Sequence, residues 1–247
     1  MKLCILFLTL FFTSCSHSDN VLVHIPEASG ICYAKNTNSL FVANDEGTVF
    51  EISTDGKIIR KKRLGHYDLE GVACDSEKSK LYFAVEGADN ILIVNQKTLT
   101  IQQEINIKRK FKKVTVLKKD KKSGLEGITI TPNGIYLSNQ SNKKWPKDDC
   151  SVVIRVDKIK KKKTAIKKII DHGFQDISGL SFHNGYLYMV SDEQNILIKY
   201  DLENKKTIST KNLQNMAYEG VTFDDSNCIY FADDNGRVLK YNSKGFL

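Results

Sequence analysis

Short segments in which apolar and polar residues alternate recur along the chain after residue 20. Examples are residues 39–43, 81–85 and 187–190, each followed by a turn rich in Asp, Asn, Glu or Gly. A period of two is the pattern of a strand with one buried face, and about 4–8 residues is a typical strand length. The pattern therefore predicts an all-β protein made of many short antiparallel strands.

A short motif marks each repeat of this pattern. It has Glu or Ser, then Gly, then an apolar residue and a β-rich stretch, and its five glycines are Gly30, Gly71, Gly127, Gly179 and Gly220. The glycines are spaced 41, 56, 52 and 41 residues apart. A period of roughly 40–50 residues is that of a β-propeller blade.

The repeats predict a five-bladed β-propeller of four-stranded antiparallel blades over residues 21–247. The last repeat ends after its third strand, and residues 21–25 can supply the missing outer strand. The ring is then closed by an N-terminal strand, which leaves no exposed edge at the junction of the two chain ends. A sixth, degenerate blade within one of the two longer intervals is the alternative.

The first residues carry the pattern of an export signal. Lys2 precedes an apolar run over residues 3–12, which is too short to span a bilayer but fits a signal peptide. Small residues before Cys15 resemble the bacterial lipobox, so residues 1–14 are predicted to be a lipoprotein signal and 15–20 a lipidated tether. The protein is then a lipoprotein of the cell envelope facing the periplasm. Plain secretion and an uncleaved N-terminus are the alternatives.

Four cysteines remain in the mature chain beyond Cys15, and no two form a CxxC pair that would indicate zinc. Since Cys32 and Cys74 lie in apolar strands, we expect them to be small buried side chains. An exported compartment permits disulfides, but the sequence alone does not pair these cysteines.

Two sets of acidic residues are predicted to share one face of the ring. In each repeat, the innermost strand begins at the motif and runs away from this face, and the second strand runs back toward it. The inner set is Glu70, Glu126 and Glu219, with Ser29 and Ser178 completing the ring. The outer set lies in the turns after the second strands and includes Asp45, Glu46, Glu86, Asp192, Glu193, Asp233 and Asp234.

Three glutamates that converge on a narrow channel repel one another. A cation, raised pKa values or hydrogen bonds to backbone amides can relieve this repulsion. Oxygen ligands suit Ca²⁺ or Mg²⁺, so Glu70, Glu126 and Glu219 are candidate metal ligands. The alternative is that each glutamate only locks its blade to the next, and that the turn acids are ordinary turn residues.

Basic residues gather elsewhere, in two runs over residues 108–122 and 158–168, and the chain has a formal net charge of +8. Such runs favour anionic headgroups or acidic glycans, or are simply solvated surface. Nucleic acid is not expected, because the runs lack interleaved aromatic residues.

The sequence contains no GxSxG, HExxH, Walker or GxGxxG motif. Asp171 and His172 form a possible acid–base pair near the fourth motif. Trp145 lies in a long excursion over residues 139–149, which could cap the acidic face as a recognition loop.

Five motifs in order resemble the SdiA-regulated, YjiK-like family of β-propellers over residues 25–241. They are carried by residues 68–71, 125–127, 176–179, 191–193 and 218–220, with 27–30 and 44–46 resembling the family's first blade. The resemblance implies an envelope-associated propeller, similar to phytase-like and esterase-like members of a wider group. The chain departs from the family pattern at Asn139–Gln140 and at residues 232–235.

Three functions follow as hypotheses. The first is a non-catalytic binding module that presents its acidic face to a small ligand or to another envelope protein. The second is a Ca²⁺-dependent hydrolase of the phytase-like or esterase-like kind, in which the ion polarises a phosphate or acyl group. The third is a scaffold with no ligand. Whether the protein is an enzyme stays open at this point.

Overall fold

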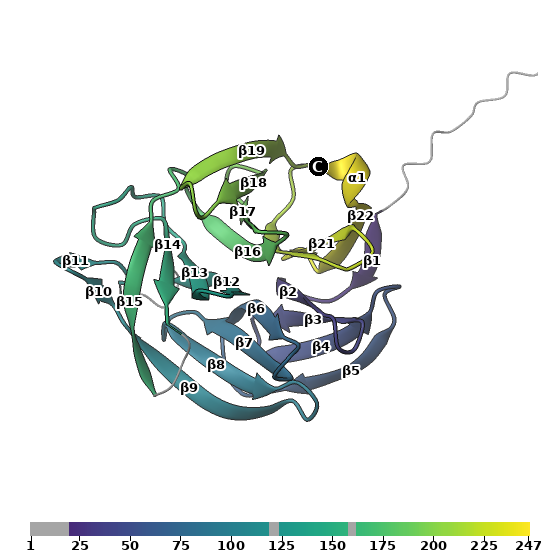
Figure 1. The fold of residues 1–247 in the computed structure, drawn as a ribbon. Helices are drawn as coiled ribbons and strands as arrows, with labels where there is room; N and C mark the ends of the chain where they lie inside the picture. Colours follow the sequence, from purple (N-terminus) through teal and green to yellow (C-terminus); the bar gives the residue numbers. More distant parts are fainter. Residues whose placement is uncertain (1–19, 119–123, 158–161) are drawn as a thin grey trace, which may run out of the picture.

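The fold was analysed in a computed structural model, which describes residues 20–118, 124–157 and 162–247. Figure 1 shows strands arranged in groups around a central axis. The predicted signal sequence, Cys15 and parts of both basic runs lie outside the described residues. No helix in the described ranges is long and apolar enough to cross a membrane.

The strands form five repeat units, each an antiparallel meander of four strands. The first unit contains β2 (Ala28–Ala34), β3 (Ser39–Asn44), β4 (Thr48–Ser53) and β5 (Ile58–Arg63). The second contains β6 (Leu69–Asp75), β7 (Lys80–Val85), β8 (Asn90–Asn95) and β9 (Thr100–Lys108). The third contains β12 (Leu125–Thr131), β13 (Gly134–Asn139), β14 (Val152–Val156) and β15 (Lys163–Ile170).

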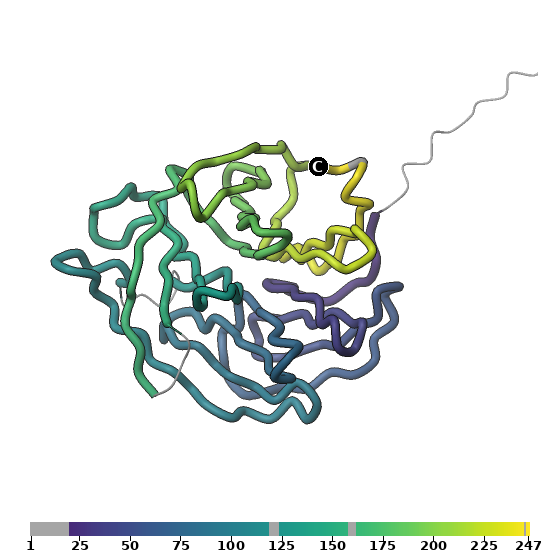
Figure 2. Tube along the Cα trace, in the orientation of Figure 1, coloured from purple at the N-terminus to yellow at the C-terminus, as the bar shows by residue number. Residues whose placement is uncertain are grey.

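The fourth unit contains β16 (Ile177–His183), β17 (Tyr186–Ser191), β18 (Ile196–Asp201) and β19 (Lys206–Asn212). The fifth contains β20 (Tyr218–Phe223), β21 (Cys228–Asp233), β22 (Arg237–Asn242) and β1 (Val21–His24). β1 pairs antiparallel with β22, so the N-terminal strand completes the last unit as the sequence predicts. Figure 2 shows the N-terminal strand beside the C-terminal part of the chain at this junction.

The all-β, propeller-like architecture is confirmed, but hydrogen bonding does not divide it into five separate four-stranded sheets. The second and third units form one eight-stranded sheet, because β15 pairs in parallel with β9 over residues 163–165 and 106–108. These two outer strands have eight and nine residues, which lets them meet beyond the edges of their own units. A hairpin of β10 (Lys110–Phe111) and β11 (Val114–Thr115) follows β9.

The units close a ring through their inner strands. β2 lies against β6, β6 against β12, β12 against β16, β16 against β20, and β20 against β2. Five clusters of buried apolar side chains lie between successive units, and one of them joins the fifth unit to the first. Each unit therefore buries its two faces against two neighbours, which is how repeat architectures obtain a continuous core.

The motif glycines make this close approach possible. A Cβ added at Gly71 would lie 2.5 Å from the Glu126 carbonyl oxygen and 2.9 Å from the Cα of Gly127 in the next unit. A Cβ at Gly179 would likewise lie 2.8 Å from the Glu219 carbonyl oxygen in the next unit. Real Cβ atoms do not come this close to backbone, so the motif needs glycine where one inner strand passes the next.

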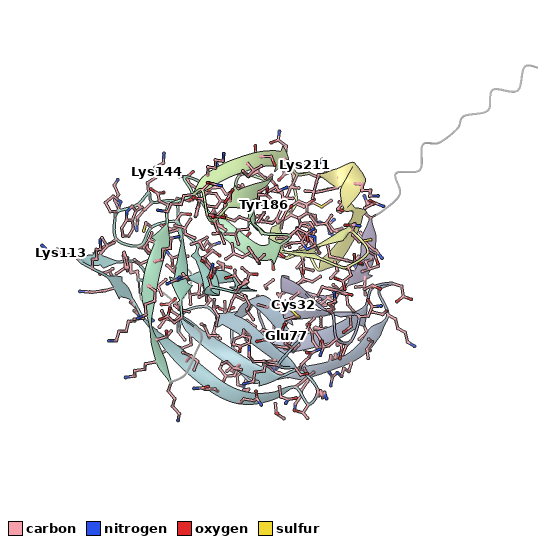
Figure 3. The ribbon with its side chains drawn as sticks, viewed as in Figure 1. Cys32, Glu77, Lys113, Lys144, Tyr186 and Lys211 are labelled. Atoms are coloured by element: carbon pink, nitrogen blue, oxygen red, sulfur yellow. A yellow bond between two sulfur atoms is a disulfide. The ribbon has the colours of Figure 1, made fainter. Side chains whose placement is uncertain are left out.

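Cys32 and Cys74 form a disulfide between β2 and β6, with Cα atoms 5.8 Å apart. The sequence predicts small buried side chains and leaves the pairing of the cysteines open; Cys32 is buried, and the structure bonds it to Cys74. The two residues are 42 positions apart in sequence, and only ring packing brings their strands together. Figure 3 shows Cys32 near the centre of the molecule. Cys150, which is buried, and Cys228, which is partly buried, are free.

Candidate metal centre

A β-bulge turns the motif acids out of the strand pairing. In β20, Tyr218 pairs with Asp233 and Gly220 with Ala232, which leaves Glu219 as the extra residue. The register shifts at the same Glu/Ser-Gly step in all five inner strands. Bulges re-aim side chains, and here they repeat around the ring. The motif therefore specifies the direction of its acid as well as the close packing of its glycine.

The turns between second and third strands lie beside the motifs, as the predicted strand directions require. Glu86 N donates to the Asp68 carbonyl at 3.0 Å, and Asp234 N donates to the Ala217 carbonyl at 2.9 Å. The corresponding turn of the third unit is held by Gln140 N on the Gly124 carbonyl at 2.8 Å. The inner and outer sets of acids thus share one face.

The tightest group of acids is Asp68, Glu70 and Glu86. One carboxylate oxygen of each lies within 4.8 Å of the others, and Glu70 is the most buried of the three. All three come from the second unit: Asp68 directly precedes β6, Glu70 is its second residue, and Glu86 lies in the turn after β7. Three carboxylates at this spacing match the oxygen ligands that Ca²⁺ and Mg²⁺ prefer.

This grouping differs from the predicted set of Glu70, Glu126 and Glu219. Those three also interact, since burial and then the charges of Glu70 and Glu219 raise the pKa of Glu126. Only Glu70, however, belongs to the tight group. Asp68 was missed as a candidate ligand, although an acid two residues before Glu70 at the entry to a predicted strand was the available signal.

Burial is the main cause of raised pKa values throughout the cluster. It raises the pKa of Glu70 well above its ordinary range, helped by the charges of Asp68 and Glu86. It raises the pKa of Glu219 likewise, with Asp192 as the next contributor. Because these carboxyls are crowded and desolvated, each gains from a proton or a cation.

Two carboxyls in the cluster are raised into the neutral range. Burial followed by the charge of Asp68 raises the pKa of Glu86 to about 7. Burial, followed by a hydrogen bond that the protonated Asp45 carboxyl donates to Glu27, raises the pKa of Asp45 to about 7. Asp45 Oδ1 and Glu219 Oε2 are buried and have no hydrogen-bond partner in the described part of the chain. These two oxygens are further potential ligand atoms beside the tight group.

Several residues predicted for the ligand face make internal contacts instead. Ser178 Oγ donates to the Tyr218 carbonyl at 2.8 Å and so links the fourth unit to the fifth. Ser29 Oγ donates to the Glu27 carbonyl at 3.2 Å. Asp233 is fully buried and pairs with Arg237, whose Nε lies 2.6 Å from Oδ2. The other predicted turn acids remain at the surface or half-buried, namely Glu46, Asp192, Glu193 and Asp234.

Two further predictions are corrected by the structure. His172 is buried, its Nδ1 accepts from Phe174 N at 3.1 Å, and desolvation lowers its pKa to about 4, so it is not paired with Asp171. Trp145 does not cap the acids. It packs beside Phe111, with ring centroids 6.3 Å apart, along the outer strand β15.

One cation of the first basic run reaches the acidic face. The Arg109 guanidinium forms an ion pair with Asp89 in the turn after β7, and Arg109 Nη2 donates to the Ala88 carbonyl at 3.1 Å. Asp89 is buried, and burial raises its pKa to about 6 although Arg109 opposes that shift. Arg109 therefore contacts two residues of the turn that carries Glu86.

The raised pKa values predict that the metal-free protein loses stability as the pH rises. A carboxyl with a raised pKa stabilises the fold while it is protonated, and that contribution is lost as the pH passes its folded pKa. For Glu86 and Asp45 this point is about 7. His172 acts in the opposite direction, but only below its ordinary pKa of 6.5.

In EDTA, we therefore expect the midpoint of thermal unfolding to fall by roughly 5 °C between about pH 6.5 and about pH 8.5. Calorimetry across this range measures the slope, and Glu86→Gln should reduce it because that position then carries no charge. A midpoint that rises over this interval in the wild-type protein would contradict the description of the cluster.

The fold and the acidic centre define an all-β, propeller-like protein of repeat units with carboxylates gathered on one face. The chain belongs to the SdiA-regulated family, whose model matches residues 19–236. This confirms the family suggested by the motifs. A search of curated proteins found no significant match.

Two solved structures are similar in fold. Myxococcus xanthus glutaminyl cyclase aligns with a TM-score of 0.67 at 12% identity, over 88% of this chain and 91% of that one. Kuenenia stuttgartiensis hydrazine synthase aligns with a TM-score of 0.50 at 14% identity, over 90% of this chain and 59% of that one. At these identities the likeness concerns the fold alone.

Proposed function

We propose that this protein is a binding module that holds a divalent cation, Ca²⁺ or Mg²⁺, on its acidic face and uses it to bind a ligand or partner. The observation that supports it best is the group of Asp68, Glu70 and Glu86, with ligand atoms within 4.8 Å of one another. A cation at this point would satisfy charges that otherwise repel each other in a desolvated site.

The ring geometry supports binding to an outside molecule. The cluster lies where the inner strands begin, and Asp68 and Glu86 are half-buried, so a bound ion would keep coordination positions open toward solvent. Water or an anionic group of a ligand would complete its shell, as is common for Ca²⁺ and Mg²⁺. The partner would then be a phosphate- or carboxylate-bearing small molecule, or an acidic surface of another envelope protein.

Calcium titration followed by thermal unfolding tests the cation. At saturating Ca²⁺ and about pH 7.5, we expect the midpoint to rise by roughly 5–10 °C over the value in EDTA, since only the folded state holds the site. Glu86→Gln should raise the midpoint in EDTA, because it removes a repelling charge, and should abolish most of the response to Ca²⁺. Misfolding would not produce these two opposite changes.

Glu77→Gln is the matched control. Glu77 belongs to the same unit but is exposed in the turn between β6 and β7, at the opposite end of β6 from Glu70 (Figure 3). Its response to Ca²⁺ should equal that of the wild-type protein. If neither Ca²⁺ nor Mg²⁺ shifts the wild-type midpoint, the cation proposal is wrong and the acids have a purely structural role.

Hydrolysis is the second candidate function. It is favoured by the pKa of about 7 at Glu86 and Asp45, since a carboxyl that titrates near neutral pH can transfer protons. Assays on phosphate esters, phytate and acyl esters, with and without Ca²⁺, separate this candidate from binding alone. An N-terminal glutamine peptide extends the assay to the activity named for the Myxococcus protein.

We also propose that the five repeat units are the blades of a five-bladed propeller. The closed sequence of inner strands supports this, and the parallel pairing of β9 and β15 is then an added contact between two blades.

The location proposed for the protein rests on the sequence: lipidation at Cys15 would anchor it to an envelope membrane facing the periplasm, and no nucleic-acid partner is expected.

A further inference from the structure

A groove of about 450 Å³ lies on the outer side of the third unit, away from the acidic face. Its floor is the end of β15, and its walls come from the β10–β11 hairpin, the loop over residues 140–151 and the turn between β18 and β19. The groove exists because β15 pairs with β9 only over residues 163–165. After residue 165, β15 pairs only with β14 along one edge, and its other edge borders the groove. Small-molecule sites have about this volume.

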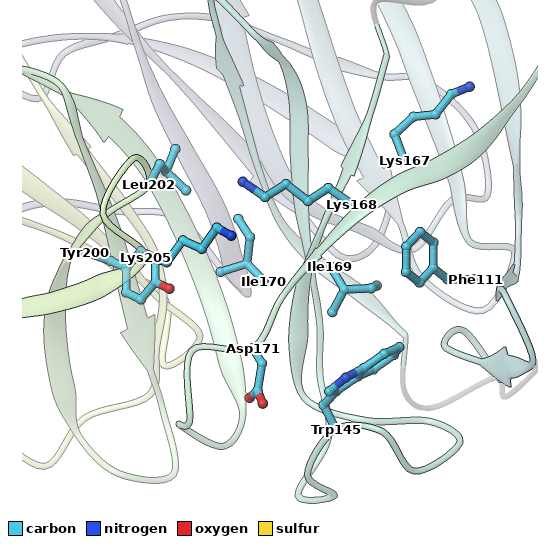
Figure 4. Close-up of a pocket in the computed structure, with 10 residues that line it drawn as sticks. All are labelled: Phe111, Trp145, Lys167, Lys168, Ile169, Ile170, Asp171, Tyr200, Leu202 and Lys205. Carbon is cyan, nitrogen blue, oxygen red and sulfur yellow. The ribbon is translucent and has the colours of Figure 1, made fainter.

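Two lysines converge at one end of the groove. Figure 4 shows the ammonium groups of Lys168 and Lys205 pointing toward each other beside Ile170. Lys168 is half-buried, and neither lysine forms an ion pair with a carboxylate within the described ranges. By contrast, the neighbouring Lys167 pairs with Asp157 at 3.5 Å. Two lysine side chains directed to one end of a groove can donate together to a phosphate or carboxylate, so this end offers a site for an anion.

The other end of the groove is aromatic. Trp145 and Phe111 pack on the buried cluster between the second and third units and remain partly exposed. Their rings are tilted by 54°, so they form an angled wall rather than a flat stack. Figure 4 shows the Asp171 carboxylate on the same side as Trp145. Asp171 is exposed and forms no ion pair in the described part of the chain.

These features together select one ligand class. An acyl chain would bury apolar surface on Trp145 but would leave Asp171 against hydrocarbon. A molecule that carried only negative charge would be repelled by the same carboxylate. A sugar ring has apolar C–H faces that pack on an indole and hydroxyl groups that donate to a carboxylate.

We propose that this groove binds a saccharide that carries one phosphate or carboxylate group. Lys168 and Lys205 hold the anion, Trp145 packs on the sugar face, and Asp171 accepts hydrogen bonds from its hydroxyls. This site is independent of the cation on the acidic face, and it gives part of the second basic run a specific partner.

Trp145 is the only tryptophan in the chain, so its fluorescence reports directly on the groove. The experiment titrates the full protein, in EDTA, with glucose 1-phosphate, glucuronic acid, glucose and inorganic phosphate. We expect a saturable change in emission with the phosphorylated sugar, the acidic sugar or both. Comparison of the two affinities shows whether the lysines prefer a phosphate or a carboxylate group. Glucose and inorganic phosphate should bind at least about tenfold more weakly, since each lacks half of the contacts.

Lys168→Gln and Lys205→Gln should each weaken binding of the acidic sugar by about tenfold, the usual scale of one lost charge-assisted contact. Lys206→Gln is the matched control, because Lys206 is exposed next to Lys205 and does not line the groove. Its affinity should be unchanged. Asp171→Asn should weaken the acidic sugar but not inorganic phosphate.

The proposal is overturned if no acidic sugar changes the emission, or if both lysine variants bind like the wild-type protein. It is also overturned if inorganic phosphate binds as tightly as glucose 1-phosphate. A response to phosphatidylglycerol vesicles without a response to acidic sugars would assign the groove to a membrane surface instead. A circular dichroism spectrum of each variant identifies loss of folding.

Discussion

Gly71→Ala is expected to cost about 4 kcal/mol of folding stability and to leave little folded protein at growth temperature. The new Cβ would lie 2.5 Å from the Glu126 carbonyl oxygen, 2.7 Å from Ile128 N and 2.9 Å from the Gly127 Cα. All three neighbours are backbone atoms of the inner strand of the next unit, so no side chain can move aside. The ring would have to open at this junction, and urea unfolding measures the loss.

Gly173→Ala is the control for this substitution. Gly173 has a φ of +81°, which alanine adopts only with strain, but a Cβ there would meet nothing within 4 Å. Its cost should be about 1 kcal/mol, from backbone strain alone. If Gly71→Ala costs no more than Gly173→Ala, the inner strands do not pass as closely as described, and the reason given for the motif glycines is wrong.

Loss of the Cys32–Cys74 disulfide should have an effect of similar size. The bond closes a loop of 42 residues, and the chain-entropy model assigns about 4 kcal/mol to a loop of this length. For a chain of this size, that lowers the midpoint of thermal unfolding by roughly 10 °C. The double variant Cys32→Ser, Cys74→Ser and the wild-type protein in strong reductant should give the same lowered midpoint.

Cys228→Ser is the matched control, because Cys228 is a free, partly buried thiol in β21. It should change stability by less than about 1 kcal/mol and leave the effect of reductant intact. Detection of Cys32 and Cys74 as free thiols in protein isolated without reductant would contradict the pairing. The bond connects the first two units, so its removal should also increase hydrogen exchange in β2 and β6.

Much of the fold could be predicted because its information is local. The alternation of apolar and polar residues defines strands, and the regular spacing of the glycines defines the repeat. The sequence also predicted that residues 21–25 close the ring, since the last repeat has three strands and needs a fourth. The parallel pairing of β9 with β15 could not be predicted, because it depends on how two neighbouring units are inclined in space.

The candidate site was predicted in part. Strand direction alone placed the motif acids and the turn acids on one face, and the structure shows them together. The sequence could not predict which carboxylates lie nearest to one another, because that depends on distances of a few ångström. A β-bulge decides where Glu70 points, and the turn geometry brings Glu86 and Asp68 within 4.8 Å of it.

Contacts between residues far apart in sequence account for the remaining differences. Cys32 meets Cys74 only because the first unit packs against the second, and Arg109 pairs with Asp89 only because the chain after β9 returns to the turn that follows β7. Trp145 was expected over the acids but follows the long loop outward to Phe111. No local pattern records these contacts, since each depends on the relative position of two separately formed elements.

The sequence by itself determined an all-β chain of five repeats, the family to which it belongs, and the face on which its acids gather. These properties follow from periodicity and from strand direction, which are set within each repeat. The tertiary structure decided which carboxylates form the tight group, which cysteines are bonded, and where the lysines and the tryptophan form a groove. Those properties depend on the packing of one repeat against the next, because only ring closure fixes the distances between side chains of different repeats.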